Sequence, residues 1–193
     1  MLIGLMDLLN DPEEKSKLER LFINYQQTMY HSAYKIIKNQ HDAEDAVQQA
    51  FLRIMDHMGD IDENEVGKTR SYLSIVARNM AIDIYRKKKR EMAHTVSFDE
   101  HELFIEDPAG QDFEDVEIEE DHGLEEALAR ALKKLPIKYA DVVRLTYGHG
   151  LSSEKVGEIL NISADNVRQR LVRARKKLAE LMGTDMEDMK EEE

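Results

Sequence analysis

The chain has 193 residues, a length that suits one ordinary domain or two small ones. It contains no cysteine, so disulfide scaffolds, thiolate zinc sites and cysteine hydrolases are excluded, and a reducing cytoplasm is the expected compartment. No apolar run approaches the ~20 residues of a membrane helix, and we therefore expect no insertion into a membrane.

The formal net charge of -13 is unevenly distributed along the chain. Residues 93–124 contain 12 acidic side chains and no Lys or Arg, whereas residues 1–92 contain 15 acidic and 14 basic side chains. Residues 125–183 carry 12 basic and 7 acidic side chains, and the tail 184–193 is acidic again. The pattern predicts two lobes with basic faces that are joined by a polyanionic linker.

The first lobe is predicted to begin with two helices. Asp11 suits an N-cap and Pro12 a first helical position, and apolar residues then recur every three or four positions as far as Ile36. Asp42 is the expected cap of the second helix, which also has one apolar face, and Gly59 is its expected end.

A third helix completes the first lobe. The segment 59–67 is polar, acidic and without period, so we expect a loop there. The helix then runs from Thr69 into the basic cluster at 86–90. Its predicted apolar face consists of Leu73, Val76, Ala77, Met80, Ala81 and Ile84.

The second lobe follows a segment that is too polar to fold alone. Residues 93–123 have no sustained apolar period, and we expect a flexible acidic linker. Helices are then predicted at 124–135 and 137–147, before the turn 148–150.

Two further helices are predicted at the end of the chain. Ser152 caps a short helix that ends at Leu160, and Ser163 caps a final helix that Gly183 ends. Residues 184–193 are expected to form a disordered acidic tail. Because no β-strand alternation appears, the predicted fold class is all-α, with two small helical domains at 1–92 and 124–183.

The most specific functional signal is this last pair of helices. Two short helices separated by about four residues, with a shared apolar core, describe a helix-turn-helix that binds DNA. Asn and Gln near the start of the second helix suit adenine and Arg suits guanine, while later cations suit phosphates. A solvated basic face is the simpler alternative, but six cations without an acid between Arg168 and Lys177 favour DNA. The candidates are Ser163, Asp165, Asn166, Arg168, Gln169, Arg170, Arg173, Arg175 and Lys176.

The third helix of the first lobe carries a second signal. It interleaves aromatic, amide and basic side chains, a mixture that suits unpaired DNA because bases stack on rings while cations follow the backbone. Tyrosine at helical spacing is equally typical of a core, and a basic run is typical of a solvated helix end, so these residues alone leave both interpretations open. They are Tyr72, Arg78, Asn79, Tyr85, Arg86 and Lys87.

A cluster of acids opens the second helix. Asp42, Glu44 and Asp45 would stabilise a helix through its dipole without any ligand. A carboxylate metal site with His41 or His57 is the sharper alternative, but the Glu-x-x-His pairing of di-iron bundles is absent from this helix. We also find no phosphate-binding loop or nucleophile elbow, and we therefore expect no metal, no cofactor and no catalytic site.

Three segments, in order, resemble the extracytoplasmic-function (ECF) class of RNA polymerase sigma factors. Residues 42–53 (DAEDAVQQAFLR) are similar to the helix by which sigma factors bind the polymerase clamp. Residues 70–73 (RSYL) and 77–83 (ARNMAID) resemble the helix that melts promoters and reads the -10 element. Leu135-Pro136, residues 156–163 (VGEILNIS) and residues 167–178 resemble the domain that reads the -35 element.

The resemblance covers about residues 12–182 and implies a protein that binds core RNA polymerase and directs it to promoter DNA. It further implies that the linker threads towards the RNA exit channel and that an anti-sigma factor is a partner. A linker with 12 acids would suit an electropositive channel as a mimic of RNA, and a solubilising tether is the simpler alternative. Clamp binding would rest on Asp45, Gln48, Gln49, Leu52 and Arg53. Binding of -10 DNA would rest on Lys68, Arg70, Tyr72, Arg78, Asn79, Arg86 and Lys87, and -35 binding on the helix-turn-helix candidates above.

The chain departs from the family's pattern at four positions. Tyr72 stands where Trp is usual, and Lys155 replaces the Glu of a capping box, so that Ser152 loses its reciprocal partner. Gly157 replaces Ala at a cost of roughly 0.5–1 kcal/mol in helix stability. Asn161 stands where Gly is common, and Asn tolerates a left-handed backbone.

Two other classes of protein share part of this pattern. A helix-turn-helix regulator with a helical sensory or partner-binding domain would have the second lobe, but it would have no reason for a clamp-binding helix. A pure adaptor protein would need neither set of DNA-facing side chains.

Overall fold

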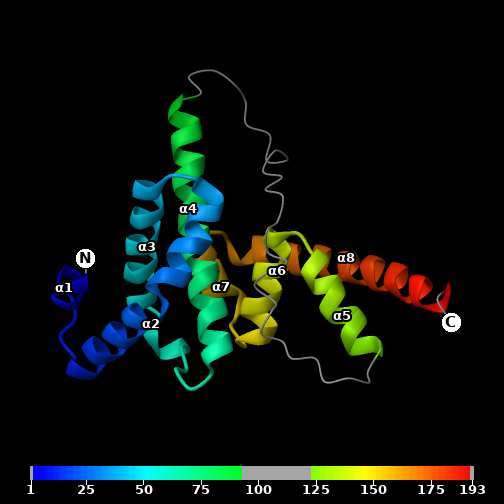
Figure 1. Cartoon of the computed structure of the whole chain (residues 1–193), viewed down its shortest axis with the longest axis horizontal. Helices are drawn as coiled ribbons and strands as arrows, with labels where there is room; N and C mark the ends of the chain where they lie inside the picture. The colour runs from blue at the N-terminus through cyan, green and yellow to red at the C-terminus, as the bar shows by residue number, and fades with distance from the viewer. Residues whose placement is uncertain (1, 93–122, 192–193) are drawn as a thin grey trace. The chain divides into compact units, whose positions relative to one another are not determined.

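The computed structural model describes the backbone of residues 2–92 and 123–191, and every regular element in these ranges is helical (Figure 1). The all-α prediction is therefore confirmed for this part of the chain. Two compact units are present, Met1–Ile105 and Glu106–Glu193, and their boundary falls within the expected linker. The linker residues 93–122 lie outside the described residues. None of the described helices is long and apolar enough to cross a membrane.

The first unit is a bundle of three long helices, α2 (Pro12–Ile37), α3 (Gln40–Met55) and α4 (Val66–Met92), with the short α1 (Leu2–Met6) against α2 (Figure 1). α2 begins where predicted, because the Asp11 side chain accepts a hydrogen bond from the Glu13 N–H. The three apolar faces meet in one core. Fully buried side chains there include Leu18, Leu21, Met29, Ala46, Phe51, Ile54, Leu73, Val76 and Ala77.

The junction of α2 and α3 differs from the prediction. Lys38, in the left-handed backbone region at φ 53°, ends α2, and Asn39 caps α3 by accepting a hydrogen bond from the Asp42 N–H at 3.1 Å. Asp42 is therefore not the cap. It is 8% exposed and accepts hydrogen bonds from Lys88 Nζ at 2.6 and 2.7 Å, which joins α3 to the end of α4.

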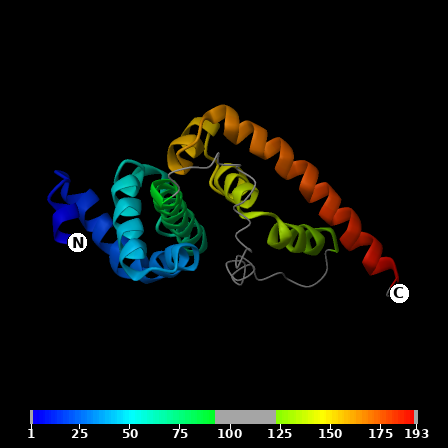
Figure 2. The ribbon, with the colours of Figure 1, turned by 90° about the horizontal axis from the view of Figure 1, so that it is seen from above.

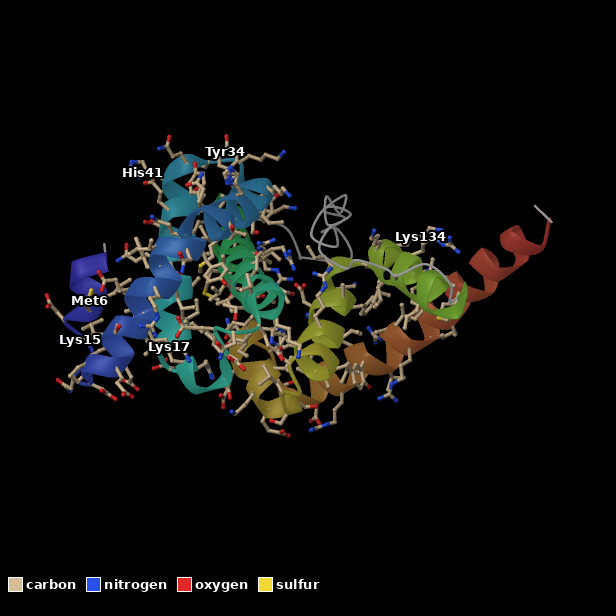
Figure 3. The ribbon with its side chains drawn as sticks, turned by 60° about the horizontal axis from the view of Figure 1, so that its bottom comes forward. Met6, Lys15, Lys17, Tyr34, His41 and Lys134 are labelled. Carbon is tan, nitrogen blue, oxygen red and sulfur yellow. The ribbon has the colours of Figure 1, made fainter. Side chains whose placement is uncertain are left out.

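The connection from α3 to α4 is more ordered than the expected loop. α3 ends at Met55 rather than at Gly59, and a 3₁₀ turn (Met58–Asp60) follows. Lys17 Nζ donates to the carbonyls of Met58 and Ile61 at 2.8 and 2.6 Å, so a side chain from α2 holds this turn. Lys17 lies near the start of α2, at the opposite end of the helix from Tyr34 (Figure 3).

α4 begins at Val66, three residues before the predicted start. The hydroxyl of Thr69, which is buried, donates to the Asp62 carbonyl at 2.8 Å and ties the first turn of the helix to the loop. Arg20 forms two hydrogen bonds of 2.8 Å with the Glu63 carboxylate. Contacts from both α2 and α4 therefore hold the loop in place. Its polar composition predicted only an irregular loop and gave no sign of these contacts.

The second unit consists of α5 (Gly123–Lys134), α6 (Ile137–Val143), α7 (Ser153–Leu160) and α8 (Ala164–Glu191). A π-helical turn (Arg144–Gly148) continues α6, so the helix predicted at 137–147 is present but changes its winding. α5, α6 and α7 all pack against α8, whose carboxyl-terminal end projects beyond them (Figure 2). One core cluster joins Leu135, Ala140 and Ala174 to Leu132, Tyr139, Val143 and Leu178.

α7 and α8 form the predicted helix-turn-helix. The Ser152 side chain accepts a hydrogen bond from the Lys155 N–H at 3.3 Å, and Ser163 accepts one from the Asn166 N–H at 3.1 Å, so both predicted caps are confirmed. Asn161 ends α7 in the left-handed region at φ 53°, the backbone that we expected it to tolerate.

Gly157 has a structural role that its helix propensity does not reveal. A β-carbon at this position would lie 2.6 Å from the carbonyl oxygen of Ile162 and 3.4 Å from the amide nitrogen of Ala164. The turn that leads into α8 therefore crosses α7 at the place where a side chain is missing. The absence of a β-carbon permits this close approach.

The predicted end of α8 was wrong. The helix continues through Gly183 to Glu191, so residues 184–191, which we expected to be disordered, are helical. A glycine inside a helix costs about 1 kcal/mol but ends it only where the chain turns into the left-handed region, and no positive φ occurs at Gly183.

Candidate nucleic-acid interface

The outward face of α8 carries most of the side chains that were predicted to bind DNA. Val167, Leu171 and Ala174 are buried against the rest of the unit. Exposed on the remaining surface are Asp165, Arg168, Gln169, Arg173, Arg175 and Lys176, with Asn166 and Arg170 partly exposed. Ser163 differs from these residues, because its hydroxyl already caps the helix. The helix thus presents cations and amides together on a face that the core does not use.

Two carboxylates hold Arg168. Its guanidinium donates to Asp165 Oδ1 at 2.6 Å and to Glu154 Oε1 at 3.2 Å. The hydrogen bonds that Arg168 donates, to Asp165 first and then to Glu154, raise the pKa of Arg168 above its usual value. The pKa of Glu154 is lowered by hydrogen bonds from its own N–H, from the Ser152 hydroxyl and from Arg168. Glu154 therefore gives Ser152 a carboxylate partner, although Lys155 replaces the usual one.

A second contact joins α8 to the π-helical turn. Arg175 Nη2 donates to the Tyr147 hydroxyl at 2.7 Å, and Tyr147 remains 58% exposed. Sequence reasoning missed Tyr147 and Glu154 as neighbours of this surface. They lie 28 and 14 residues from their arginine partners, and no local pattern connects residues at such separations.

The residues of α4 that were expected to bind -10 DNA lie on different sides of the helix. At about 100° per residue, Lys68, Asn79 and Arg86 fall on one line along the helix, whereas Arg70 lies on the opposite side and Lys87 on a flank. Lys68 is exposed, and Asn79 and Arg86 are partly exposed. Nearby acids pair with both cations, Glu65 with Lys68 at 2.5 Å and Asp83 with Arg86 at 4.0 Å. Ile75, which is fully buried, lies on the same line between Lys68 and Asn79, so the candidate surface consists of Lys68 near the start of α4 and of Asn79 with Arg86 further along.

Tyr72 and Arg78 do not lie on this surface. Their exposed fractions are 1% and 4%, and the Tyr72 ring is among the largest fully buried side chains. Burial raises the pKa of the Tyr72 hydroxyl, the carboxylate of Asp60 acts in the same direction, and Arg53 opposes both. This packing corrects the expectation that the Tyr72 ring is available to stack on a base. It supports the alternative interpretation, in which Tyr72 is a core residue.

The two faces of α3 separate as the sequence indicates. Ala43, Ala46, Val47, Ala50, Phe51 and Ile54 are buried. Asp45, Gln48, Gln49 and Leu52 are exposed on the opposite side, with Arg53 partly exposed beside them. Leu52 is 40% exposed and is the apolar member of an otherwise polar face. The structure therefore brings the expected clamp-binding residues together on one surface.

No group of three or more metal-ligating side chains occurs in the described parts of the chain. Glu119 and His122, which have the spacing of a ligand pair, lie outside those parts. At the acid-rich start of α3, Asp42 is paired with Lys88.

Comparisons with known proteins agree with this arrangement. Family models for sigma-70 region 2 and sigma-70 region 4 match residues 21–91 and 125–178. The ECF RNA polymerase sigma factor SigW of Bacillus subtilis is 32% identical over 160 residues, which are 80% of this chain and 82% of SigW. SigM of the same organism is 29% identical over 171 residues, 89% of this chain and 98% of SigM. Each matched region falls within one of the two helical units, and the chain therefore belongs to the ECF family of RNA polymerase sigma factors.

Proposed function

We propose that the second unit reads the -35 element through α8, while the first unit binds the polymerase clamp through α3 and -10 DNA through α4. As a member of its family, the chain binds core RNA polymerase and directs it to promoters. The outward face of α8 is the observation that best supports this assignment of roles. It presents cations and amides on a helix-turn-helix whose two caps and turn are formed.

Arg168 and Gln169 are the proposed base readers. Both are exposed in the first two turns of α8, the part of a recognition helix that reaches base edges in the major groove. Arg168 uses one donor for each of its two carboxylate partners, and a guanidinium has five N–H donors, so further donors can reach O6 and N7 of guanine. Glu154 and Asp165 hold the planar group in place for that contact.

Arg173, Arg175 and Lys176 are the proposed phosphate contacts. They lie one to two turns further along α8, where a recognition helix leaves the base edges and approaches the backbone. The hydrogen bond from Arg175 to Tyr147 fixes the direction of one of these cations. Such contacts add affinity but no sequence information.

In the first unit the proposed contacts are made by exposed faces only. Asp45, Gln48, Gln49, Leu52 and Arg53 would bind the clamp, because the buried face of α3 is already used by the core. The line of Lys68, Asn79 and Arg86 would follow the melted strand, with cations at its ends and an amide between them.

Four further parts of the proposal rest on family membership. The protein acts in the cytoplasm with RNA polymerase and carries no catalytic site. Its acidic linker follows the RNA exit channel, where 12 acids without a Lys or Arg at 93–124 would suit an electropositive path. An anti-sigma factor holds the protein inactive until a signal releases it.

Reconstitution with core polymerase tests the proposal. Transcription from a library of promoters should enrich defined -10 and -35 elements. A helix-turn-helix regulator with a sensory domain would enrich no such element, because it would not direct the polymerase. Arg168→Ala should cost roughly 1–3 kcal/mol at one base pair, whereas Arg173→Ala should weaken all sequences alike and reduce the salt slope by about 1. Unchanged specificity in both Arg168→Ala and Gln169→Ala would show that another surface reads the -35 element.

A further inference from the structure

One apolar side chain interrupts the polar face of α8. Val172 is 64% exposed, although Val167 and Leu171 on the same helix are buried in the core. Its position is three residues after Gln169 and four after Arg168, so the three side chains are neighbours on the helix surface. It also precedes Arg175 by three residues. Val172 thus lies between the proposed base readers and the proposed phosphate contacts.

This position limits what Val172 can contact. It is on the outward side of α8 and does not contribute to the core that Val167 and Ala174 form. Valine has no hydrogen-bonding group, so it cannot read the donors and acceptors of base edges. The major groove offers one apolar feature to such a side chain, the 5-methyl group of thymine.

The shape of valine suits that contact. A β-branched side chain in a helix has one strongly preferred rotamer, so its two methyl groups are held in a fixed direction before DNA arrives. Little side-chain entropy is lost when such a group is buried. A longer apolar side chain at the same place would have to be ordered on binding.

We propose that Val172 binds the 5-methyl group of a thymine in the -35 element and so determines specificity at that base pair. The inference rests on the proposed reading of this element by α8. With a rise of about 1.5 Å per residue, Val172 lies roughly 4.5–6 Å along the helix from Gln169 and Arg168. The thymine is therefore one or two base pairs from the bases that those residues read, since successive pairs are about 3.4 Å apart.

Replacing thymine by uracil removes the methyl group and leaves every hydrogen-bonding group in place. Holoenzyme made from the full chain and core polymerase would first select its promoter from a library. Each thymine of the selected -35 element would then be replaced singly by deoxyuridine, and binding would be measured by competition. We expect a loss of about three- to fivefold at one position, the change that corresponds to burial of one methyl-sized group.

Variants of Val172 assign that loss to the side chain. Val172→Ala should bind the thymine and deoxyuridine promoters equally, because the methyl group then has no partner, and Val172→Ile should still distinguish them. Ile23→Ala is a matched control, because Ile23 is 63% exposed and lies on α2, a helix that carries none of the proposed DNA contacts. It should leave the ratio of the two affinities unchanged.

The outcomes separate this inference from the proposed function. If a -35 element is selected and Arg168→Ala alters it, but no thymine is sensitive to its methyl group, Val172 is an ordinary exposed side chain and the inference fails alone. Persistence of the methyl effect in Val172→Ala would also overturn it. If no -35 element is selected, or if substitutions in α8 leave the selected element unchanged, the proposed reading helix and the inference fail together.

Discussion

Replacement of Gly157 by alanine tests the geometry of the helix-turn-helix. The added β-carbon would lie 2.6 Å from the Ile162 carbonyl oxygen, with backbone atoms of Ala164 and Ser163 at 3.4 and 3.5 Å. Ordinary contacts between carbon and a carbonyl oxygen are about 3.3 Å or longer, so the turn has to move by roughly 0.7 Å. All three obstacles are backbone atoms, and no side chain can rotate away to relieve the contact.

Two opposing contributions determine how much Gly157→Ala changes the unfolding free energy. Overpacking of this kind costs about 1–3 kcal/mol, and alanine returns about 0.5–1 kcal/mol through its better helix propensity. We therefore expect Gly157→Ala to lower the unfolding free energy of the second unit by about 0.5–2 kcal/mol. Gly183 offers a matched control on α8, since nothing lies within 4 Å of its β-carbon position. Gly183→Ala should raise the same free energy by about 0.5–1 kcal/mol.

Scanning calorimetry of the full chain measures both variants. One kcal/mol shifts the midpoint of a unit of this size by about 4–8 °C, so the two variants should move the transition of the second unit in opposite directions. The transition of the first unit serves as an internal reference. If Gly157→Ala stabilises the protein as much as Gly183→Ala does, the close approach of the turn to α7 is not a constraint and the argument is wrong.

Four other predictions concern the first unit. Asp45→Arg, or Gln48→Glu with Leu52→Asp, should weaken binding to core polymerase by at least about tenfold, roughly 1.4 kcal/mol, while circular dichroism stays helical, and retained binding would remove α3 from the interface. Tyr72→Ala should cost about 3–5 kcal/mol of stability in urea unfolding because the ring is in the core, whereas Asn79→Ala should keep stability and impair opening of duplex promoters more than of pre-melted ones. A Tyr72→Ala protein as stable as the parent would contradict the expected loss of stability. An equal loss of promoter opening on both templates in Asn79→Ala would contradict the expected role in melting. The hydrogen bonds from Arg20 hold the pKa of Glu63 below its usual range, so ionised Glu63 stabilises the fold above its ordinary pKa, and that contribution disappears as the pH falls through the lowered pKa. Glu63→Gln should therefore flatten the acid side of the stability profile by less than about 1 kcal/mol, and a profile identical to that of the parent would refute the coupling.

Most features that depend on neighbouring residues could be predicted from the sequence alone, although the cap of α3 is Asn39 and not the expected Asp42. The caps at Asp11, Ser152 and Ser163 each bind an N–H two or three residues away, so they are complete within one turn of chain. Apolar residues at helical spacing likewise identify the buried side of α3 and, by exclusion, the exposed side with Gln48 and Leu52. The helix-turn-helix combines such local signals, and for that reason its position and its basic face were predictable.

Features that depend on how the helices pack were decided only by the tertiary structure. α4 packs against both α2 and α3, so it is buried over a wider arc than one apolar stripe indicates, and Tyr72 lies inside that arc. The partners of Asp42 and Arg168 include residues 46 and 14 positions away, Lys88 and Glu154, which no periodicity connects. Gly157 is an unfavourable helix residue in isolation and becomes useful only because the following turn crosses it. Periodicity assigns a side chain to a face, whereas the width of the buried face and the partner of each charge follow from the packing of separate helices.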